Sequence, residues 1–257
     1  VPNETITKIT LHKRLNLQIP FISSAMDTVT ESKMAIAIAK MGGIGVVHRN
    51  LSADMQVSEI KKVKKANFLV GAAIGVNNND LDRAKKLIEA KVDMIVIDTA
   101  HGHTQKVSKM IYKIKKITKK IPLCAGNIAT GKAAKFLASC GADIVKVGIG
   151  PGSICTTRLV AGVGVPQLSA ILDVKKALGK SKTKIISDGG IKFSGDLAKA
   201  IAAGADAVMI GSLFSGTTES PGKILKRKGK LYKTFRGMGS AGATVSYTHL
   251  TLPTIRE

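Results

Sequence analysis

The sequence is short of aromatic residues, cysteines and long apolar runs. It contains no tryptophan, and aromatic residues make up 4% of its 257 residues, so a core has to be built from aliphatic side chains. No apolar run approaches the roughly 18 residues of a membrane helix, which argues against a membrane protein. Three cysteines are too few for a disulfide framework, and the first residues carry no apolar targeting core. These absences predict a cytoplasmic location.

Acidic residues are also scarce. There are 17 Asp and Glu against 40 Lys and Arg, which gives a formal net charge of +23. Such a charge either attracts polyanions or forms a solvated surface. The lysines spread along the whole chain at helix-like positions, and no basic stripe is interleaved with aromatics, so nucleic acid is not the expected partner. The favoured interpretation is a positive field that attracts a phosphorylated small substrate.

Short apolar runs alternate with amphipathic stretches rich in lysine and alanine. Eight runs of the kind found in parallel strands buried on both faces lie at 19–25, 43–48, 69–75, 93–98, 121–126, 143–148, 184–190 and 206–211. Helical patterns lie at 30–41, 52–66, 79–91, 104–119, 130–140, 167–179 and 194–203. This alternation predicts an α/β protein, a closed (β/α)8 TIM barrel. An open doubly wound sheet is the alternative, but GIGPGS follows the sixth strand, not an early one, and contains Pro151.

The pattern lacks an eighth helix. The segment TTESPGKILKRKGKLYKTFRGMGS after the last strand predicts a polar loop with a small hairpin. Residues 244–257 carry no lysine and continue no helical pattern. We therefore predict a barrel domain over 1–243 and a non-matching tail over 244–257, of foreign or truncation-derived sequence, which is excluded from the fold prediction.

Polar and glycine residues follow the predicted strands, where the active site of such a barrel lies. Gly190, Gly211 and Ser212 follow the seventh and eighth strands, and their amides and hydroxyl suit a phosphate group, with Ser153 as a further wall. Asp188 could accept hydrogen bonds from a ribose diol. The alternatives are tight βα turns for the glycines and a helix or turn cap for Asp188.

The stretch VKVGIGPGSICTTR places one cysteine at the end of a loop that is almost free of side chains. Such a loop lets backbone groups approach a ligand closely, and Cys155 would then meet the reactive atom of the ligand as a thiolate nucleophile. Cys124 and Cys140 fall on a predicted strand and a predicted helix and are interpreted as inert core thiols. His101 and His103 could bind a metal, but neither CxxC spacing nor HExxH occurs.

Longer motifs run through the same positions. They are ISSAMDTVTE, GGIGVVHRN, IDTAHGH, AGNIAT, VGIGPGSICTTRLVAGVGVPQ, SDGGIKFSGDLAKAIAAGADAVMIGSLFSGTTESPG and FRGMGS. Together they resemble the catalytic barrel of bacterial IMP dehydrogenases, of the IMP dehydrogenase/GMP reductase family, over residues 2–242. The resemblance implies oxidation of IMP to XMP with NAD, a step of GMP biosynthesis, through a covalent cysteine thioimidate in a homotetramer.

The resemblance also implies a role for each matching site residue. Cys155 would attack carbon 2 of the hypoxanthine ring, and Thr157 would assist the thiol. The substrate-binding residues would be Ser24, Met26, Ser153, Asp188, Gly190, Gly211, Ser212, Met238 and Gly239. NAD would be bound by Asp98, Asn127, Gly148 and Gly150, and K⁺ by the carbonyls of Gly150, Gly152 and Cys155.

The sequence departs from the family pattern in three ways. The pair of CBS modules usual between the second and third barrel units is absent. Phe235 replaces a phosphate-contacting tyrosine, which costs about 1 kcal/mol of hydrogen bonding. The residues after GMGS do not match the family's flap, whose arginine activates the hydrolytic water, so the chain is expected to bind IMP but to turn it over slowly. The alternatives are a GMP reductase, which deaminates GMP to IMP with NADPH, and a non-catalytic nucleotide-binding fragment.

Overall fold

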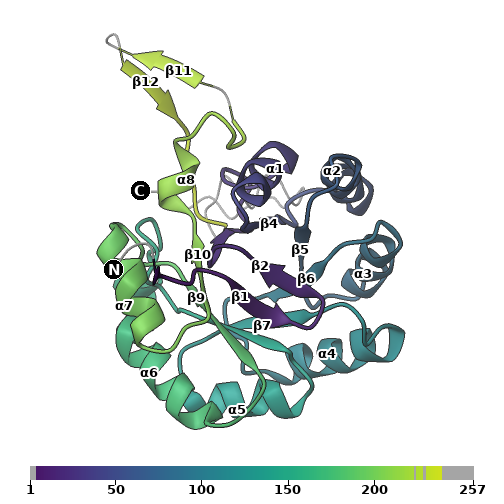
Figure 1. Ribbon diagram of the computed structural model, residues 1–257, viewed down its shortest axis with the longest axis vertical. Coiled ribbons are helices and arrows are strands. Elements are labelled where there is room, and N and C mark those ends of the chain that lie inside the picture. Colours follow the sequence, from purple (N-terminus) through teal and green to yellow (C-terminus); the bar gives the residue numbers. More distant parts are fainter. Residues whose placement is uncertain (1–3, 223, 228–229, 239–257) are drawn as a thin grey trace, which may run out of the picture.

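Eight parallel strands close into a barrel in the computed structural model of the chain (Figure 1), which describes residues 4–222, 224–227 and 230–238. The strands are β3 (Phe21–Ser23), β4 (Ile44–Val47), β5 (Val70–Ile74), β6 (Met94–Asp98), β7 (Leu123–Ile128), β8 (Ile144–Val147), β9 (Lys184–Asp188) and β10 (Ala207–Ile210). β3 pairs with both β4 and β10, which closes the ring. The predicted TIM barrel is confirmed, and every barrel strand overlaps a predicted apolar run.

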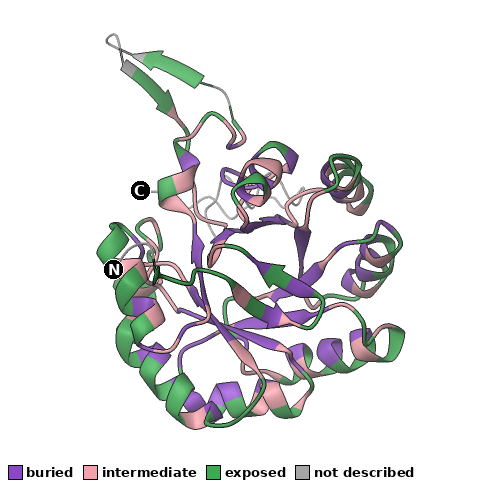
Figure 2. Ribbon diagram, in the orientation of Figure 1, coloured by how far each residue is buried: buried purple, intermediate pink, exposed green. Residues whose placement is uncertain are grey.

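Among the described residues, seven helices surround the barrel, with buried inner faces and exposed outer faces (Figure 2). They are α1 (Ser32–Lys40), α2 (Ala53–Lys65), α3 (Asp80–Glu89), α4 (Gln105–Ile117), α5 (Gly131–Ser139), α6 (Gln167–Leu178) and α7 (Ser194–Ala202). All seven lie within the predicted ranges. Ser52, Thr104 and Thr130 cap α2, α4 and α5, each side chain accepting a backbone N–H three residues on, which explains where these helices begin.

The core consists of two apolar layers. One fills the barrel interior and includes Ile22, Val96 and Ile186. The other lies between the strands and the surrounding helices and includes Ile95 and Ile111. Among the described residues no buried hydrophobic side chain is aromatic, which confirms the expectation of an aliphatic core.

A short hairpin that the sequence analysis did not predict plugs the N-terminal end of the barrel. It consists of β1 (Ile9–His12) and β2 (Leu15–Leu17), which pair antiparallel. Leu11, Leu15 and Leu17 are buried in the same cluster as Ile44 and Ile144, the first residues of β4 and β8. The alternation of leucines in LHKRLNL was the available signal, but strands of three and four residues give a weak one. The hairpin therefore covers the N-terminal end of the barrel interior.

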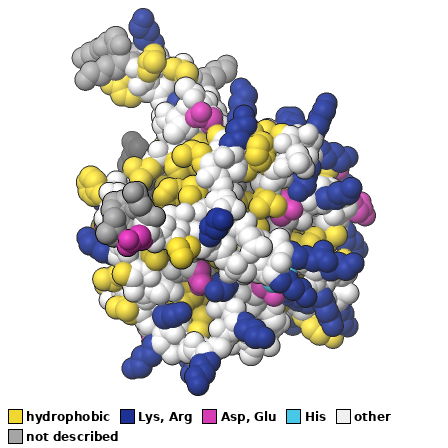
Figure 3. All heavy atoms as spheres, in the orientation of Figure 1, with side chains coloured by type: hydrophobic (Ala, Val, Ile, Leu, Met, Phe, Trp, Pro, Cys, Tyr) yellow, Lys and Arg dark blue, Asp and Glu magenta, His cyan; other side chains and the backbone are white. Residues whose placement is uncertain are grey.

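Three aspartates fasten neighbouring strands at that plugged end. Each precedes a strand by one residue, accepts an N–H from the neighbouring strand and pairs with a lysine. The sets are Asp93 with Val70 and Lys64, Asp143 with Leu123 and Lys115, and Asp206 with Ile185 and Lys184. These three lysines therefore help to stabilise the sheet. Figure 3 shows lysine and arginine side chains scattered over one face of the molecule in separate groups.

The chain continues from β10 into a four-residue helix, α8 (Ser212–Ser215), which was not predicted. The predicted hairpin follows as β11 (Ile224–Arg227) and β12 (Lys230–Lys233), and it projects away from the barrel (Figure 1). The predicted tail over 244–257 lies outside the described residues. Within the described part of the chain, no helix has the length and apolar character needed to cross a bilayer.

Candidate active site

A cavity of about 590 Å³ opens at the C-terminal end of the barrel. Loops that follow six of the barrel strands line it, together with Phe235, Gly237 and Met238. The predicted site residues on its wall are Ser24, Met26, Asp98, Asn127, Gly148, Gly150, Gly152, Ser153, Cys155, Thr157, Asp188, Gly190, Gly211, Ser212 and Met238. Gly239 lies outside the described residues. The fold therefore brings every predicted site residue that is described to one cavity.

Cys155 lies on the loop between β8 and α6 and is exposed. Its thiol donates a hydrogen bond to Thr157 Oγ1 at 3.2 Å. A π-helical turn that the sequence analysis did not predict, η2 (Thr157–Ala161), follows directly. Cys124 has a very different environment, because burial in the barrel interior raises the pKa of its thiol to about 12. Because the thiolate is the nucleophile, these environments favour Cys155 over Cys124.

Gly190, Gly211 and Ser212 form one corner of the cavity at the ends of β9 and β10. Gly190 has φ +80°, which a side chain adopts only with strain. A Cβ on Gly211 would lie 3.1 Å from Met26 Sδ and 3.4 Å from Ser24 Oγ, so a larger residue would crowd this corner. Backbone amides and hydroxyl groups in such a concavity are suited to an anion.

A lysine that the sequence analysis missed forms the floor of the cavity. Lys146, on β8, is only 3% exposed, and its Nζ lies 2.8 Å from Asp98 Oδ1 and 2.5 Å from Asp188 Oδ2. Burial alone would lower the pKa of the ammonium, but the two carboxylates outweigh it and raise that pKa above its usual range. Burial alone would likewise raise the pKa of Asp98, but the charge and hydrogen bond of Lys146 hold it below its usual range. Lys146 and Asp98 are therefore both charged at neutral pH.

Asn127 extends this network from β7. Its Nδ2 donates to the Gly148 carbonyl at 2.7 Å and to Asp188 Oδ2 at 2.8 Å, and its Oδ1 accepts from Lys146 Nζ. Gly148 has to be glycine, because a Cβ there would lie 2.1 Å from the Asp188 carbonyl oxygen. Among the described residues, the hydrogen bonds to the Asp188 carboxylate go to Oδ2, which leaves Oδ1 open to a ligand.

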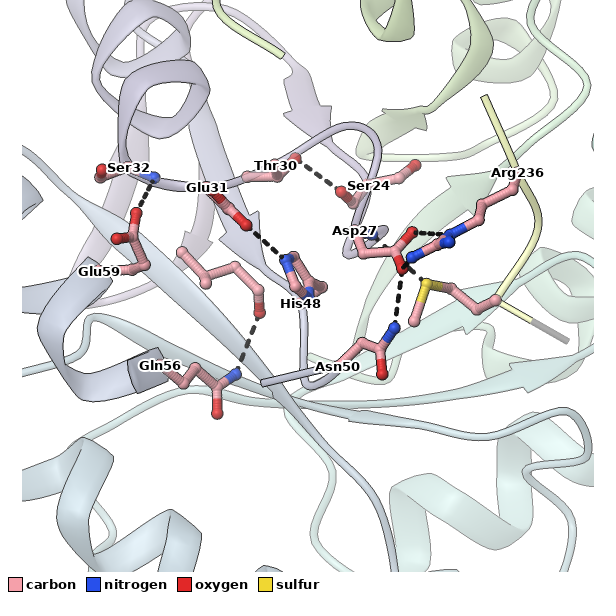
Figure 4. A network of polar contacts seen from close by, with 12 residues as sticks. Ser24, Asp27, Thr30, Glu31, Ser32, His48, Asn50, Gln56, Glu59 and Arg236 are labelled. Carbon is pink, nitrogen blue, oxygen red and sulfur yellow. Dashed lines mark hydrogen bonds and ion pairs between the residues drawn. The ribbon is translucent and has the colours of Figure 1, made fainter. Parts of the chain in front are cut away.

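Arg236 fastens the segment at 235–238 to the loop after β3 (Figure 4). Its Nη2 lies 2.5 Å and its Nε 3.0 Å from Asp27 Oδ2, and Asn50 Nδ2 donates to the same oxygen at 2.7 Å. The backbone N–H of Asp27 donates to Met238 Sδ at 3.4 Å. This Asp27–Arg236 latch, which the sequence analysis did not predict, therefore holds Met238 at the cavity.

The model of the IMP dehydrogenase / GMP reductase domain matches residues 1–251 of the chain. The chain belongs to the IMP dehydrogenase / GMP reductase family. It is 46% identical to the inosine-5'-monophosphate dehydrogenase of Borreliella burgdorferi, with 95% of this chain and 72% of the relative covered. The enzyme of the same name from Cryptosporidium parvum is 44% identical over 96% of the chain and 72% of the relative, and that from Bacillus subtilis is 35% identical over 95% and 76%.

Membership of the IMP dehydrogenase / GMP reductase family makes the chain an oxidoreductase. The alignment with the Bacillus subtilis relative runs over 371 positions, so more than a hundred of them have no counterpart among the 257 residues here. In this family member α2 ends at Lys65 and β5 begins at Val70, so no inserted domain separates the second and third barrel units.

We expect Asp27→Asn to weaken the latch of this family member and to destabilise the barrel. Charge-assisted hydrogen bonds are lost, so the free energy of unfolding at pH 7 should fall by about 1–3 kcal/mol. Burial would raise the pKa of Asp27, but hydrogen bonds from Arg236 and Asn50 outweigh it and lower that pKa below its usual range. The stabilisation from Asp27 is therefore complete above its unfolded pKa of about 3.9, and it is lost as the pH falls through the lower folded value.

Urea unfolding of both proteins at pH 7 and near pH 3 measures this effect. The difference between wild type and Asp27→Asn should be largest at pH 7 and should shrink at the acidic end. Asp82→Asn is the matched control, because Asp82 forms an exposed ion pair with Lys85, worth at most about 0.5 kcal/mol. An equal loss at both pH values would show that the Asp27 charge is not what stabilises the latch.

Proposed function

We propose that the chain oxidises IMP to XMP, with NAD as the hydride acceptor. The observation that supports this best is that the Cys155 thiol opens onto the same cavity as Gly190, Gly211 and Ser212. A single mononucleotide can therefore place its phosphate at the glycine corner and its base at the thiol. The relatives named inosine-5'-monophosphate dehydrogenase support the same substrate.

In this proposal the amides of Gly190 and Gly211 and the Ser212 hydroxyl bind the phosphate of IMP, with Ser153 on the opposite loop. Asp188 Oδ1 accepts hydrogen bonds from the ribose hydroxyls, because Oδ2 is already engaged by Lys146 and Asn127. The hypoxanthine then lies between the thiol and the side chains of Met26 and Met238, which share the cavity wall.

The chemistry assigned to Cys155 begins with its thiolate. Sγ forms a bond to carbon 2 of the base, and the hydrogen on that carbon leaves with its electron pair, which oxidises the base and leaves a thioimidate. Water then adds to carbon 2 and releases a proton, and the carbon–sulfur bond breaks to give XMP and the free thiol. In this proposal Thr157 orients the thiol, which the 3.2 Å hydrogen bond from Sγ to its Oγ1 supports.

The residues proposed to hold NAD lie on the loops after β6 and β7 and on the Cys155 loop. The Asp98 side chain is 27% exposed and bonds to Lys146 through Oδ1, so the carboxylate can also accept hydrogen bonds from a ribose of the dinucleotide. Asn127, Gly148 and Gly150 would form the adjoining wall. This polar edge on the cavity fits NAD, which supplies a hydride acceptor when it is bound.

A potassium site on the Cys155 loop is part of the proposal. Carbonyl oxygens are the ligands that K⁺ takes in proteins, and the proposed donors are those of Gly150, Gly152 and Cys155. The Gly152 carbonyl accepts the Cys155 N–H at 3.1 Å and keeps a second lone pair for an ion. The donor set is therefore compatible with K⁺, which would stabilise the loop that carries the thiol.

Incubation of the purified chain with IMP, NAD and K⁺ tests the proposed function. We expect XMP and NADH in equal amounts, measured by chromatography and by absorbance. The residues after GMGS, which do not match the family's flap, lie outside the described part of the chain, and the sequence analysis expects slow turnover from that mismatch. A single-turnover experiment with mass analysis of the Cys155 peptide should therefore accompany the assay, to detect a slow or stalled thioimidate. Ammonia from GMP and NADPH would indicate a reductase, and a thermal midpoint raised by IMP without either conversion would indicate a nucleotide-binding protein.

A further inference from the structure

The loop from Ile149 to Val165 carries Cys155 but buries little apolar surface. Leu159 and Val160 are 87% and 82% exposed. Backbone hydrogen bonds within the loop are local, such as Cys155 N to Gly152 O and Val160 N to Thr156 O. Little burial and local bonding leave the shape of a loop weakly determined, so the position of the thiol needs a further constraint.

Arg158 connects the two ends of this loop. Its Nε donates to the Ile149 carbonyl at 3.1 Å, and its Nη2 donates to the Val165 carbonyl at 2.5 Å. Ile149 follows β8 by two residues, and Val165 precedes α6 by two. The ion pairs of the described residues do not include Arg158, so its charge-assisted bonds are those to the two carbonyls. One side chain, three positions after Cys155, therefore spans the neck of the loop.

Two glycines provide the space for this side chain. A Cβ on Gly150 would lie 2.6 Å from Arg158 Cγ, and a Cβ on Gly164 would lie 2.6 Å from the same atom and 2.7 Å from Nε. Real Cβ atoms do not approach other atoms so closely, so glycine is needed on both sides of the Arg158 stem. This packing gives Gly150 a structural role besides the ligand-binding role predicted for it.

We propose that Arg158 is a positioning residue that clasps the neck of the Cys155 loop and so fixes the thiol over the substrate. Its effect on turnover rests on the proposed function, whereas its effect on the loop does not. Arginine suits this position because its planar fork presents several N–H donors and reaches two carbonyls at once. A lysine presents a single ammonium on a flexible stem and cannot reproduce that fork.

Two variants perturb the clasp from opposite sides. Arg158→Lys removes the fork, and Gly164→Ala keeps the arginine but pushes its stem out of place, without requiring a positive φ. In both variants, hydrogen–deuterium exchange should show faster uptake confined to peptides from 149–165. The kcat for IMP oxidation should fall about 10- to 100-fold, because a small misplacement of a reacting group has effects of that size. The KM for IMP should stay within about threefold, since Gly190, Gly211 and Ser212, which are proposed to hold the phosphate, lie outside this loop.

Matched controls make the same chemical changes elsewhere. Arg14→Lys alters an exposed arginine in the turn between β1 and β2, and Gly195→Ala adds a Cβ that meets nothing within 4 Å. Both controls should behave as wild type in exchange at 149–165 and in kcat. Unchanged uptake at 149–165 in both clasp variants, or raised uptake with an unchanged kcat, would overturn the proposal. A wild type that never converts IMP would contradict the proposed function alone, and deuterium uptake would then decide whether the clasp exists.

Discussion

Replacing Cys155 with serine should lower the conversion of IMP to XMP by at least about 10³-fold, because a hydroxyl is far less ionised and less nucleophilic than a thiol at neutral pH. The side chains are nearly the same size, and Cys155 is exposed, so the fold should not change. IMP should still raise the thermal midpoint of the variant, since its phosphate and ribose contacts do not involve the sulfur. Product chromatography and thermal melting measure the two effects separately.

Cys140→Ser is the matched control for this variant. Cys140 is half-buried at the end of α5, away from the residues that line the cavity. The activity of the Cys140→Ser variant should stay close to that of wild type. If Cys155→Ser retained more than about a tenth of the activity, covalent catalysis by this thiol would be excluded.

Lys146→Met should destabilise the barrel by about 3–5 kcal/mol at pH 7, because removing one partner of a buried ion pair leaves uncompensated charge behind. Methionine has a similar length and leaves Asp98 and Asp188 facing each other without the ammonium. Both carboxylates belong to the proposed ligand sites, so affinity for IMP and for NAD should fall together. Urea unfolding and titration of IMP at equilibrium measure these losses.

The pH dependence of the Lys146→Met variant should have the opposite sign to that of wild type. In wild type the pKa of Asp98 is lowered, so the stability that it contributes is present above the unfolded pKa of about 3.9 and is lost on acidification. Without Lys146, burial and the neighbouring carboxylate raise that pKa. Protonation of Asp98 then removes the repulsion between the two carboxylates. The loss of stability relative to wild type should therefore shrink between pH 7 and pH 5.

Lys184→Met is the control for the loss of an ion pair as such. Lys184 lies 2.8 Å from Asp206, but its side chain is 37% exposed, so the variant should lose no more than about 1 kcal/mol. A Lys146→Met protein as stable as this control, with unchanged affinity for IMP, would contradict the role assigned to the buried network.

The pattern of apolar and polar residues along the sequence was enough to predict the elements of the barrel. Strands buried on both faces have to be apolar throughout, whereas helices on the surface have to be apolar on one side only, and both requirements are visible within a short window. The hairpin at 9–17 and the four-residue α8 were missed because so few residues carry too little periodicity. The loop that carries Cys155 could be predicted because a single cysteine at the end of a glycine-rich stretch is visible within a few residues.

What the sequence alone determined is therefore the barrel and which polar and glycine residues stand at the C-terminal ends of its strands, where the candidate site lies. Only the tertiary structure decided how these residues are held. Lys146 stands 42 positions before Asp188, and Arg236 stands 209 after Asp27, so nothing local reveals either pairing. The physical reason is that a buried charge is stable only beside an opposite charge, and only chain folding determines which distant residue lies there.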